Sequence, residues 1–178
     1  MTLKEIVIKS ANILGIDEID FENPSSNLSK LIDSAKMIFS EISLERLALK
    51  TKENISLVGG KGRYVDLAFP VREILKIKHG GKFYSVKEYP DFFEVEGDIS
   101  GTVEVHYLYY LPDATLEEKL PLPPSLSPYV VATGVVSEYY YRSGMVDEAL
   151  FYKTRFDYSI LNVSRTLRSI YLPRRPLV

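Results

Sequence analysis

The sequence predicts an α+β fold in which helical segments enclose an antiparallel β region along the chain. Apolar residues recur at helical spacing near the N-terminus, the pattern then alternates between polar and apolar side chains, and helical spacing returns near the C-terminus. We therefore expect a helical body formed by residues 1–50 and 113–172, an inserted antiparallel β-sheet at 51–112, and a C-terminal tail at 173–178.

The N-terminal segment is expected to form two amphipathic helices. The apolar positions of the first are Leu3, Ile6, Val7, Ala11 and Leu14, and those of the second are Leu28, Leu31, Ile32, Ala35, Phe39 and Ile42. Gly15 is expected to end the first helix, and Ser26 or Asn27 to cap the second.

Residues 51–112 are rich in Val, Ile, Phe and Tyr and are divided by glycine turns. The candidate strands are residues 55–58, 63–69, 73–78, 82–87, 92–95 and 101–111. The alternation is clearest in the last, where Val103, Val105 and Tyr107 alternate with Glu104 and His106. Because the connections are too short for crossover helices, we expect an antiparallel meander.

Two further helices are expected before the C-terminus. Ser127 and Pro128 form an N-cap with a first-turn proline, and Gly144 ends the segment, although its valines favour a strand. Gly134 inside this helix costs about 1 kcal/mol relative to Ala, and it can be kept where another backbone must come close. The last helix begins near Met145 and is ended by Pro173, and its apolar stripe is Phe156, Ile160, Val163, Leu167 and Ile170.

The composition argues against several classes of chemistry. The net charge is −2, Cys is absent, and His79 and His106 are the two histidines, which excludes disulfides and thiol catalysis and disfavours a zinc site. Neither histidine has a serine or carboxylate partner at the spacing of a catalytic motif. The glycines at 59–62 fit a hairpin turn better than a phosphate loop. We expect no enzyme activity, cofactor or metal.

The chain is also expected to be soluble. Its longest apolar stretch in the C-terminal third, residues 129–136, is much shorter than the roughly 20 residues of a membrane span, and its N-terminus does not resemble a signal peptide.

Tyrosines and a basic tail are the candidate interaction residues. Three consecutive tyrosines, Tyr139 to Tyr141, span most of a helix circumference and cannot all enter one core. The alternative is that one or two rings pack in the core and the others lie on the surface. The residues expected at a protein interface are Tyr139, Tyr140, Arg165, Arg168, Tyr171, Arg174, Arg175 and Leu177. The basic and apolar tail is either a flexible end or a docking peptide for a partner with acidic and hydrophobic grooves, and the case for a nucleic-acid contact is weak.

The order of several segments resembles a known family. The segments are Arg72-Glu73-Ile74-Leu75-Lys76-Ile77, the strand at 103–112, Leu122-Pro123, the capped helix at 129–141 with Ala132 and Gly134, and the helix containing Glu148 to Tyr152 and Arg155 to Tyr158. Over about residues 53–162, this order is similar to the head-to-tail connector and adaptor family of tailed bacteriophages, which includes the podoviral tubular tail protein A.

The resemblance implies a structural virion protein of the neck region, present in the host cytoplasm during assembly. It implies a homo-oligomeric ring, commonly dodecameric, that contacts the portal protein and the tail or nozzle protein, without catalytic residues. From the residues themselves we expect neither membrane contact nor sequence-specific nucleic-acid binding. The alternative from the residues is a β-rich receptor- or glycan-binding tail component, since exposed tyrosines also suit sugars.

Overall fold

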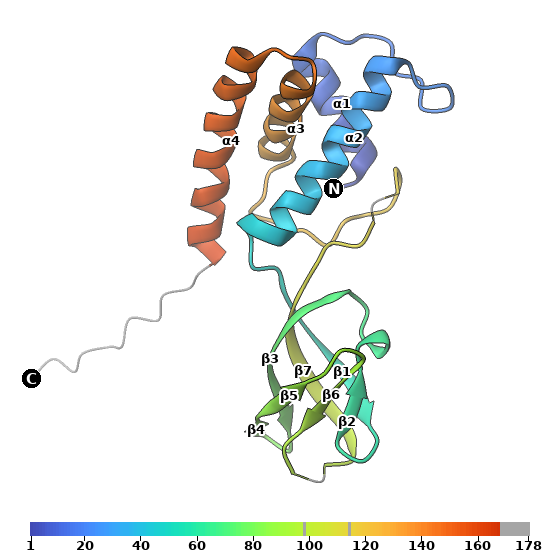
Figure 1. Cartoon of the computed structure of the whole chain (residues 1–178), viewed down its shortest axis with the longest axis vertical. Helices are drawn as coiled ribbons and strands as arrows, with labels where there is room; N and C mark the ends of the chain where they lie inside the picture. Colours follow the sequence, from blue (N-terminus) through green and yellow to red (C-terminus); the bar gives the residue numbers. More distant parts are fainter. Residues whose placement is uncertain (98, 114, 168–178) are drawn as a thin grey trace, which may run out of the picture. The chain divides into compact units, whose positions relative to one another are not determined.

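A computed structural model describes residues 1–97, 99–113 and 115–167, and Figure 1 shows its elements. The described residues form four α-helices and two antiparallel sheets, which confirms the predicted α+β class. The chain divides into two compact units. The β unit holds Met1–Lys4 and Lys36–Leu122, and the helical unit holds Glu5–Ala35 and the described residues from Pro123 onward.

The four helices are α1 (Leu3–Leu14), α2 (Ser26–Glu41), α3 (Pro128–Arg142) and α4 (Val146–Leu167). The predicted apolar stripes of α1 and α2 are largely buried, and α2 continues into a π-helical turn at Ile42–Arg46. The cap of α2 differs from the expectation by one residue. Ser25 precedes the helix, and its Oγ accepts a hydrogen bond from the Leu28 N–H at 3.3 Å. The chain therefore turns into α2 one position before Ser26.

The valine-rich segment is helix α3, as the flanking caps predicted. The Ser127 Oγ accepts a hydrogen bond from the Tyr129 N–H at 3.2 Å. Seven consecutive residues, from Val131 to Ser137, are buried. A helix buried on all sides needs no polar face, which explains why its sequence lacks an amphipathic period.

Gly134 lies at the contact between α3 and α4. A Cβ atom at this position would be 2.9 Å from Cδ2 of Phe156, which is fully buried on α4. The nearest atoms to this position therefore belong to an aromatic ring of α4. Figure 1 shows α3 and α4 lying side by side.

The β unit contains two sheets. In the first, β1 (Lys50–Leu57), β7 (Gly101–Tyr109), β3 (Val71–His79) and β4 (Lys82–Tyr84) pair in that order. In the second, the order is β2 (Lys61–Arg63), β6 (Phe92–Val95) and β5 (Val86–Glu88). All pairs are antiparallel, but the predicted meander is wrong, because β1 pairs with β7 and the turn after β1 leads into the other sheet.

Two predicted strands also differ in extent. The strand expected at 63–69 ends at Arg63, and Tyr64–Asp66 form a 3-10 turn instead. The strand expected at 82–87 is divided at Ser85 into β4 and β5, which belong to different sheets. The predicted alternation in β7 is confirmed, since Val103, Val105 and Tyr107 are buried in the β unit.

None of the helices in the described ranges combines the length and the apolar character that a membrane span requires. The predicted continuation of α4 to Ile170 and its end at Pro173 lie outside the described residues.

Candidate interaction surfaces

The outward face of the four-stranded sheet carries a charged cluster centred on β7. Glu104 accepts hydrogen bonds from the Lys52 Nζ at 3.0 Å and interacts with the His106 Nε2 at 2.7 Å. These two partners hold the pKa of Glu104 below its ordinary value. His106 therefore has a carboxylate neighbour on its own strand, a pair that the sequence reasoning did not name. Residues two apart on a strand share a face, and this spacing could have revealed the pair.

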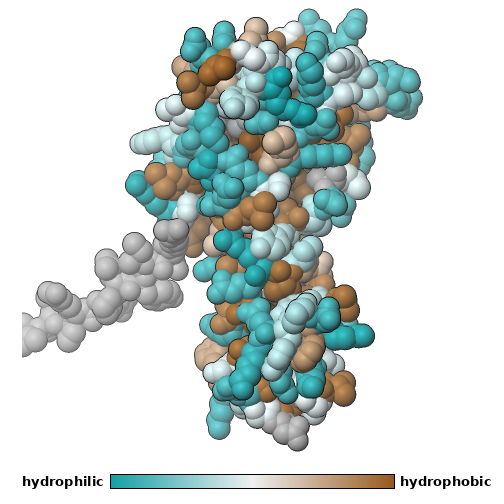
Figure 2. Space-filling model, in the orientation of Figure 1, coloured by the Kyte–Doolittle hydropathy of each residue, from teal (hydrophilic) through white to brown (hydrophobic). Residues whose placement is uncertain are grey.

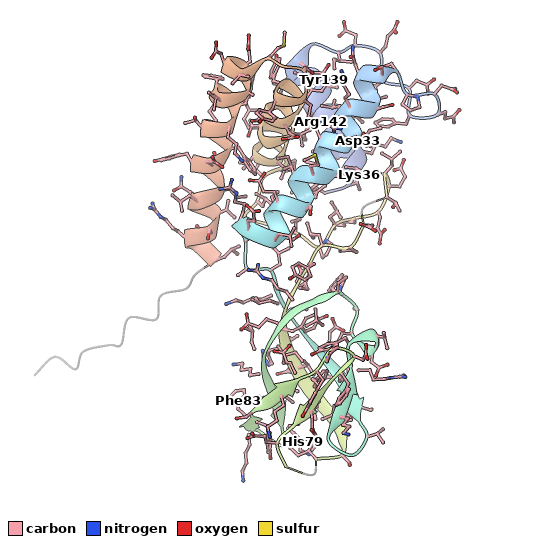
Figure 3. The ribbon with its side chains drawn as sticks, in the orientation of Figure 1. Asp33, Lys36, His79, Phe83, Tyr139 and Arg142 are labelled. Atoms are coloured by element: carbon pink, nitrogen blue, oxygen red, sulfur yellow. The ribbon has the colours of Figure 1, made fainter. Side chains whose placement is uncertain are left out.

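Cations flank this cluster on both neighbouring strands. The register places Lys52 of β1 and Lys76 of β3 opposite His106. The Lys76 ammonium lies 4.4 Å from the centroid of the Phe83 ring, and Figure 3 labels Phe83 on β4. His79 lies nearby in sequence at the end of β3, where its Nδ1 is 3.1 Å from the Thr102 carbonyl oxygen. Contacts of this kind between neighbouring strands stabilise the sheet.

A buried tyrosine network lies on the opposite face of the same sheet. The Tyr107 hydroxyl donates a hydrogen bond to Glu53 and accepts one from the Phe69 N–H at 3.4 Å. The other oxygen of Glu53 accepts the Ala68 N–H at 2.9 Å. Burial, followed by the Glu53 bond, raises the pKa of Tyr107 well above its ordinary value. The network holds the segment before β3 against the sheet and explains why this tyrosine lies in the core.

The three consecutive tyrosines of α3 have different surroundings. The Tyr140 ring stacks on Tyr152 of α4 with centroids 5.8 Å apart, and burial raises its pKa. Tyr139 contacts Tyr140 edge to face at 6.1 Å. Tyr141 is 66% exposed. Tyr139 and Tyr140 are thus half-buried within the helical unit, and Tyr141 leaves the most ring surface uncovered.

The outer face of α4 carries large apolar side chains that remain largely exposed. Phe151 is 59% exposed, Tyr158 is 70% exposed and Leu161 is 46% exposed. The inner face of the same helix buries Ala149, Phe156, Ile160 and Val163. Figure 2 shows apolar side chains, coloured brown, among hydrophilic ones on the visible surface. An amphipathic surface helix carries an apolar stripe on one face, so apolar side chains on two faces indicate a second contact.

Six residues of α4 define this outer seam: Asp147, Phe151, Thr154, Tyr158, Leu161 and Arg165. Their successive spacings are four, three, four, three and four residues, which is the spacing of a helix-pairing stripe. The sequence pattern predicted the inner stripe, of which Phe156, Ile160 and Val163 are buried and Leu167 is 38% exposed, but the outer stripe was missed although it has the same spacing.

Of the predicted interface residues, Arg165 is exposed on the outer seam of α4. The others in this region, Arg168, Tyr171, Arg174, Arg175 and Leu177, lie outside the described residues. Within the described part of the chain, no three side chains of His, Cys, Asp or Glu form a cluster that could hold a metal ion.

Comparison of the sequence with known protein-family models finds no match, and comparison with curated proteins finds none either.

Proposed function

We propose that this chain is a structural virion protein, a head-to-tail adaptor that forms a ring between the portal and the tail of a tailed bacteriophage. The proposal includes the neck of the virion as its location, the host cytoplasm as the place of assembly, and the portal and tail proteins as partners. It includes no catalytic step.

The observation that carries the proposal is the apolar surface left uncovered on each compact unit. On the β unit, Val58 and Val65 are among the exposed apolar side chains, and on the helical unit the outer seam of α4 is exposed. A ring subunit contacts two neighbours through different faces and also contacts the proteins above and below it. Such a subunit needs more apolar surface than its own core buries.

The proposal is tested by adding the purified chain to portal rings encoded by the same genome and imaging the complexes by electron microscopy. We expect a stacked ring with the rotational order that the portal accepts. A portal from an unrelated phage is the control. If no ring forms at any ratio of the two proteins, the adaptor proposal fails.

A β-rich receptor- or glycan-binding tail component remains the second candidate. It is supported by exposed aromatic rings on the β unit, where Tyr89 stacks on Phe92 with centroids 4.6 Å apart and Phe83 is exposed. Retention of the chain on a glycan array, together with no binding to portal rings, would favour this candidate.

The C-terminal tail is part of the adaptor proposal. Residues 173–178 lie outside the described residues, and their basic and apolar composition suits docking on a portal or a neighbouring subunit. A variant that lacks residues 173–178 is expected to fold but not to attach to portal-containing heads. Attachment with unchanged affinity would remove the tail from the proposal.

A further inference from the structure

We infer that the outer seam of α4 pairs with the same seam of a second copy, in an antiparallel two-fold arrangement. The starting observation is the seam itself, with exposed Phe151, Tyr158 and Leu161 at alternating spacings of three and four. A seam with this spacing stays on one side of a helix and fits another helix along its length. From Asp147 to Arg165 it extends for about 27 Å.

The ends of the seam carry opposite charges. Asp147 lies in the first turn of α4, and Arg165 lies in its last turn. Both are exposed, and within the described residues no salt bridge involves either one. Each charge is therefore available to a partner helix.

These charges decide the direction of pairing. In a parallel pair, Asp147 would face Asp147 of the second copy and Arg165 would face Arg165, which places like charges together. In an antiparallel pair centred on position 156, Asp147 faces Arg165 at both ends. Opposite charges at facing positions favour the antiparallel pair, and like charges disfavour the parallel one.

The same centre matches the apolar positions. Phe151 of one copy faces Leu161 of the other, and Thr154 faces Tyr158, so each aromatic ring meets a smaller side chain. With position 156 as the centre of the antiparallel pair, all six seam residues therefore face a seam residue of the second copy in a single register. The occupant that fits the seam is a second copy of the chain.

The pair differs in symmetry from the contacts of a ring. A two-fold pair uses the same surface on both copies and closes on itself, whereas a cyclic ring joins two different faces. The inference concerns the free protein and does not depend on the proposed function.

The first test measures the mass of the free protein by light scattering or sedimentation over a range of concentrations. We expect twice the chain mass of 20.3 kDa at high concentration, with dissociation on dilution. Leu161→Glu is expected to abolish the dimer. The matched control is Leu44→Glu, because Leu44 is 47% exposed in the β unit and lies off the seam. Circular dichroism confirms that both variants fold.

The second test concerns charge. Asp147→Arg is expected to weaken dimerisation about tenfold, and Asp147→Arg combined with Arg165→Asp to restore it, since the exchange recreates both pairs. A double variant no tighter than the single one would remove the charge argument.

The third test fixes the direction. Since the chain has no Cys, single-cysteine variants report on one position at a time. Mixed Asp147→Cys and Arg165→Cys proteins are expected to cross-link with each other under oxidation, faster than either cross-links with itself. Preferred 147–147 cross-links, a monomer at all concentrations, or a dimer unaffected by Leu161→Glu would overturn the inference. A dimer that does not assemble into a ring on the portal would contradict only the proposed function. A ring on the portal formed by a chain that does not dimerise when free would contradict only this inference.

Discussion

The ring of Phe156 lies so close to Gly134 that no side chain fits between α3 and α4 at this point. A Cβ atom on Gly134 would be 2.9 to 3.1 Å from three carbons of the ring. The ring is fully buried, and it occupies the space that the missing side chain leaves. Glycine therefore stabilises the packing of the helix pair, although it costs about 1 kcal/mol in helix propensity.

Gly134→Ala is expected to destabilise the protein. The gain in helix propensity is smaller than the cost of forcing a methyl group against a buried ring, so the free energy of unfolding should fall by about 1–2 kcal/mol. Urea denaturation followed by circular dichroism measures the change.

The control is the double variant Gly134→Ala/Phe156→Leu. Leucine is smaller than the phenyl ring, so the alanine should cost less in this background than in the wild type. If Gly134→Ala alone raises the free energy of unfolding, the contact does not restrict position 134.

Tyr107→Phe should destabilise the β unit without changing its packing. The variant removes the donor to Glu53 and the acceptor for the Phe69 N–H, and losing two partly buried hydrogen bonds, one of them to a carboxylate, should cost about 1–3 kcal/mol. Tyr89→Phe is the control, since Tyr89 is exposed and should shift stability by no more than about 0.5 kcal/mol. Equal effects of the two variants would contradict a structural role for the buried hydroxyl.

The same hydroxyl predicts a dependence of stability on alkaline pH. Burial and the Glu53 bond raise the pKa of Tyr107 above its ordinary value of 10.0, so the folded protein keeps this proton while the unfolded chain loses it. The unfolded state then binds fewer protons, and stability falls as the pH rises above about 10. Unfolding free energies measured between about pH 9 and pH 11 should fall more steeply in the wild type than in Tyr107→Phe. Parallel curves for the two proteins would show that Tyr107 does not contribute.

The helices could be predicted because their signals are local. Ser127 and Pro128 mark the start of α3 within two residues, and this cap outweighed the strand preference of the valines that follow. The pairing of the strands could not be predicted in the same way. Lys50 pairs opposite Leu108, and nothing in the local alternation of either strand specifies so distant a partner.

The candidate surfaces were predicted only in part. Tyr139 and Tyr140 stood out by composition, but the stacking of Tyr140 on Tyr152 depends on how two helices pack and is not visible in the sequence. The outer seam of α4 was visible as a second spacing of three and four. It was missed because one apolar stripe is enough to dock a helix, and the inner stripe already satisfied that requirement.

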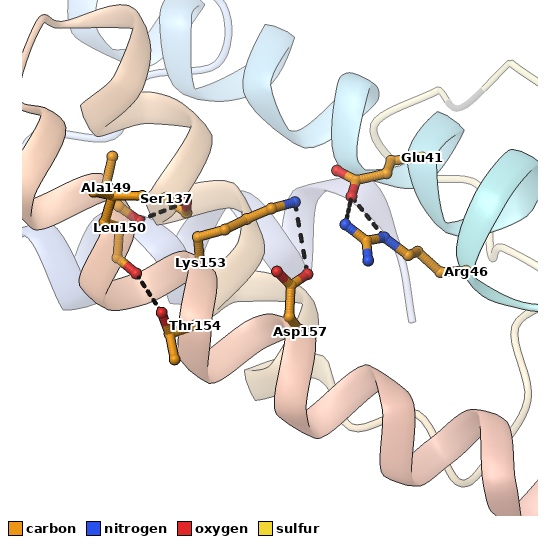
Figure 4. Close-up of polar contacts among 8 residues, drawn as sticks. All are labelled: Glu41, Arg46, Ser137, Ala149, Leu150, Lys153, Thr154 and Asp157. Carbon is orange, nitrogen blue, oxygen red and sulfur yellow. Dashed lines mark hydrogen bonds and ion pairs between the residues drawn. The ribbon is translucent and has the colours of Figure 1, made fainter.

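Ser137→Ala should loosen the junction of α3 with the start of α4. The Ser137 Oγ is buried and donates a hydrogen bond to the Ala149 carbonyl at 2.9 Å, as Figure 4 shows. This bond joins the two helices across the turn at Gly144, so its loss should cost about 0.5–1.5 kcal/mol. In this variant, the amides in the first turns of α4 should also exchange with deuterium faster than in the wild type, and this increase should be larger than that of the amides near Phe156.

Thr166→Ala is the matched control for Ser137→Ala. The Thr166 hydroxyl also donates to a carbonyl, that of Asn162 at 3.0 Å, but the bond is exposed and lies within one helix. Water replaces an exposed donor, so this variant should change stability by no more than about 0.5 kcal/mol and leave exchange at the start of α4 unchanged. If Ser137→Ala behaves like Thr166→Ala in both measurements, the buried bond does not hold the helix pair together, and side-chain packing accounts for the junction.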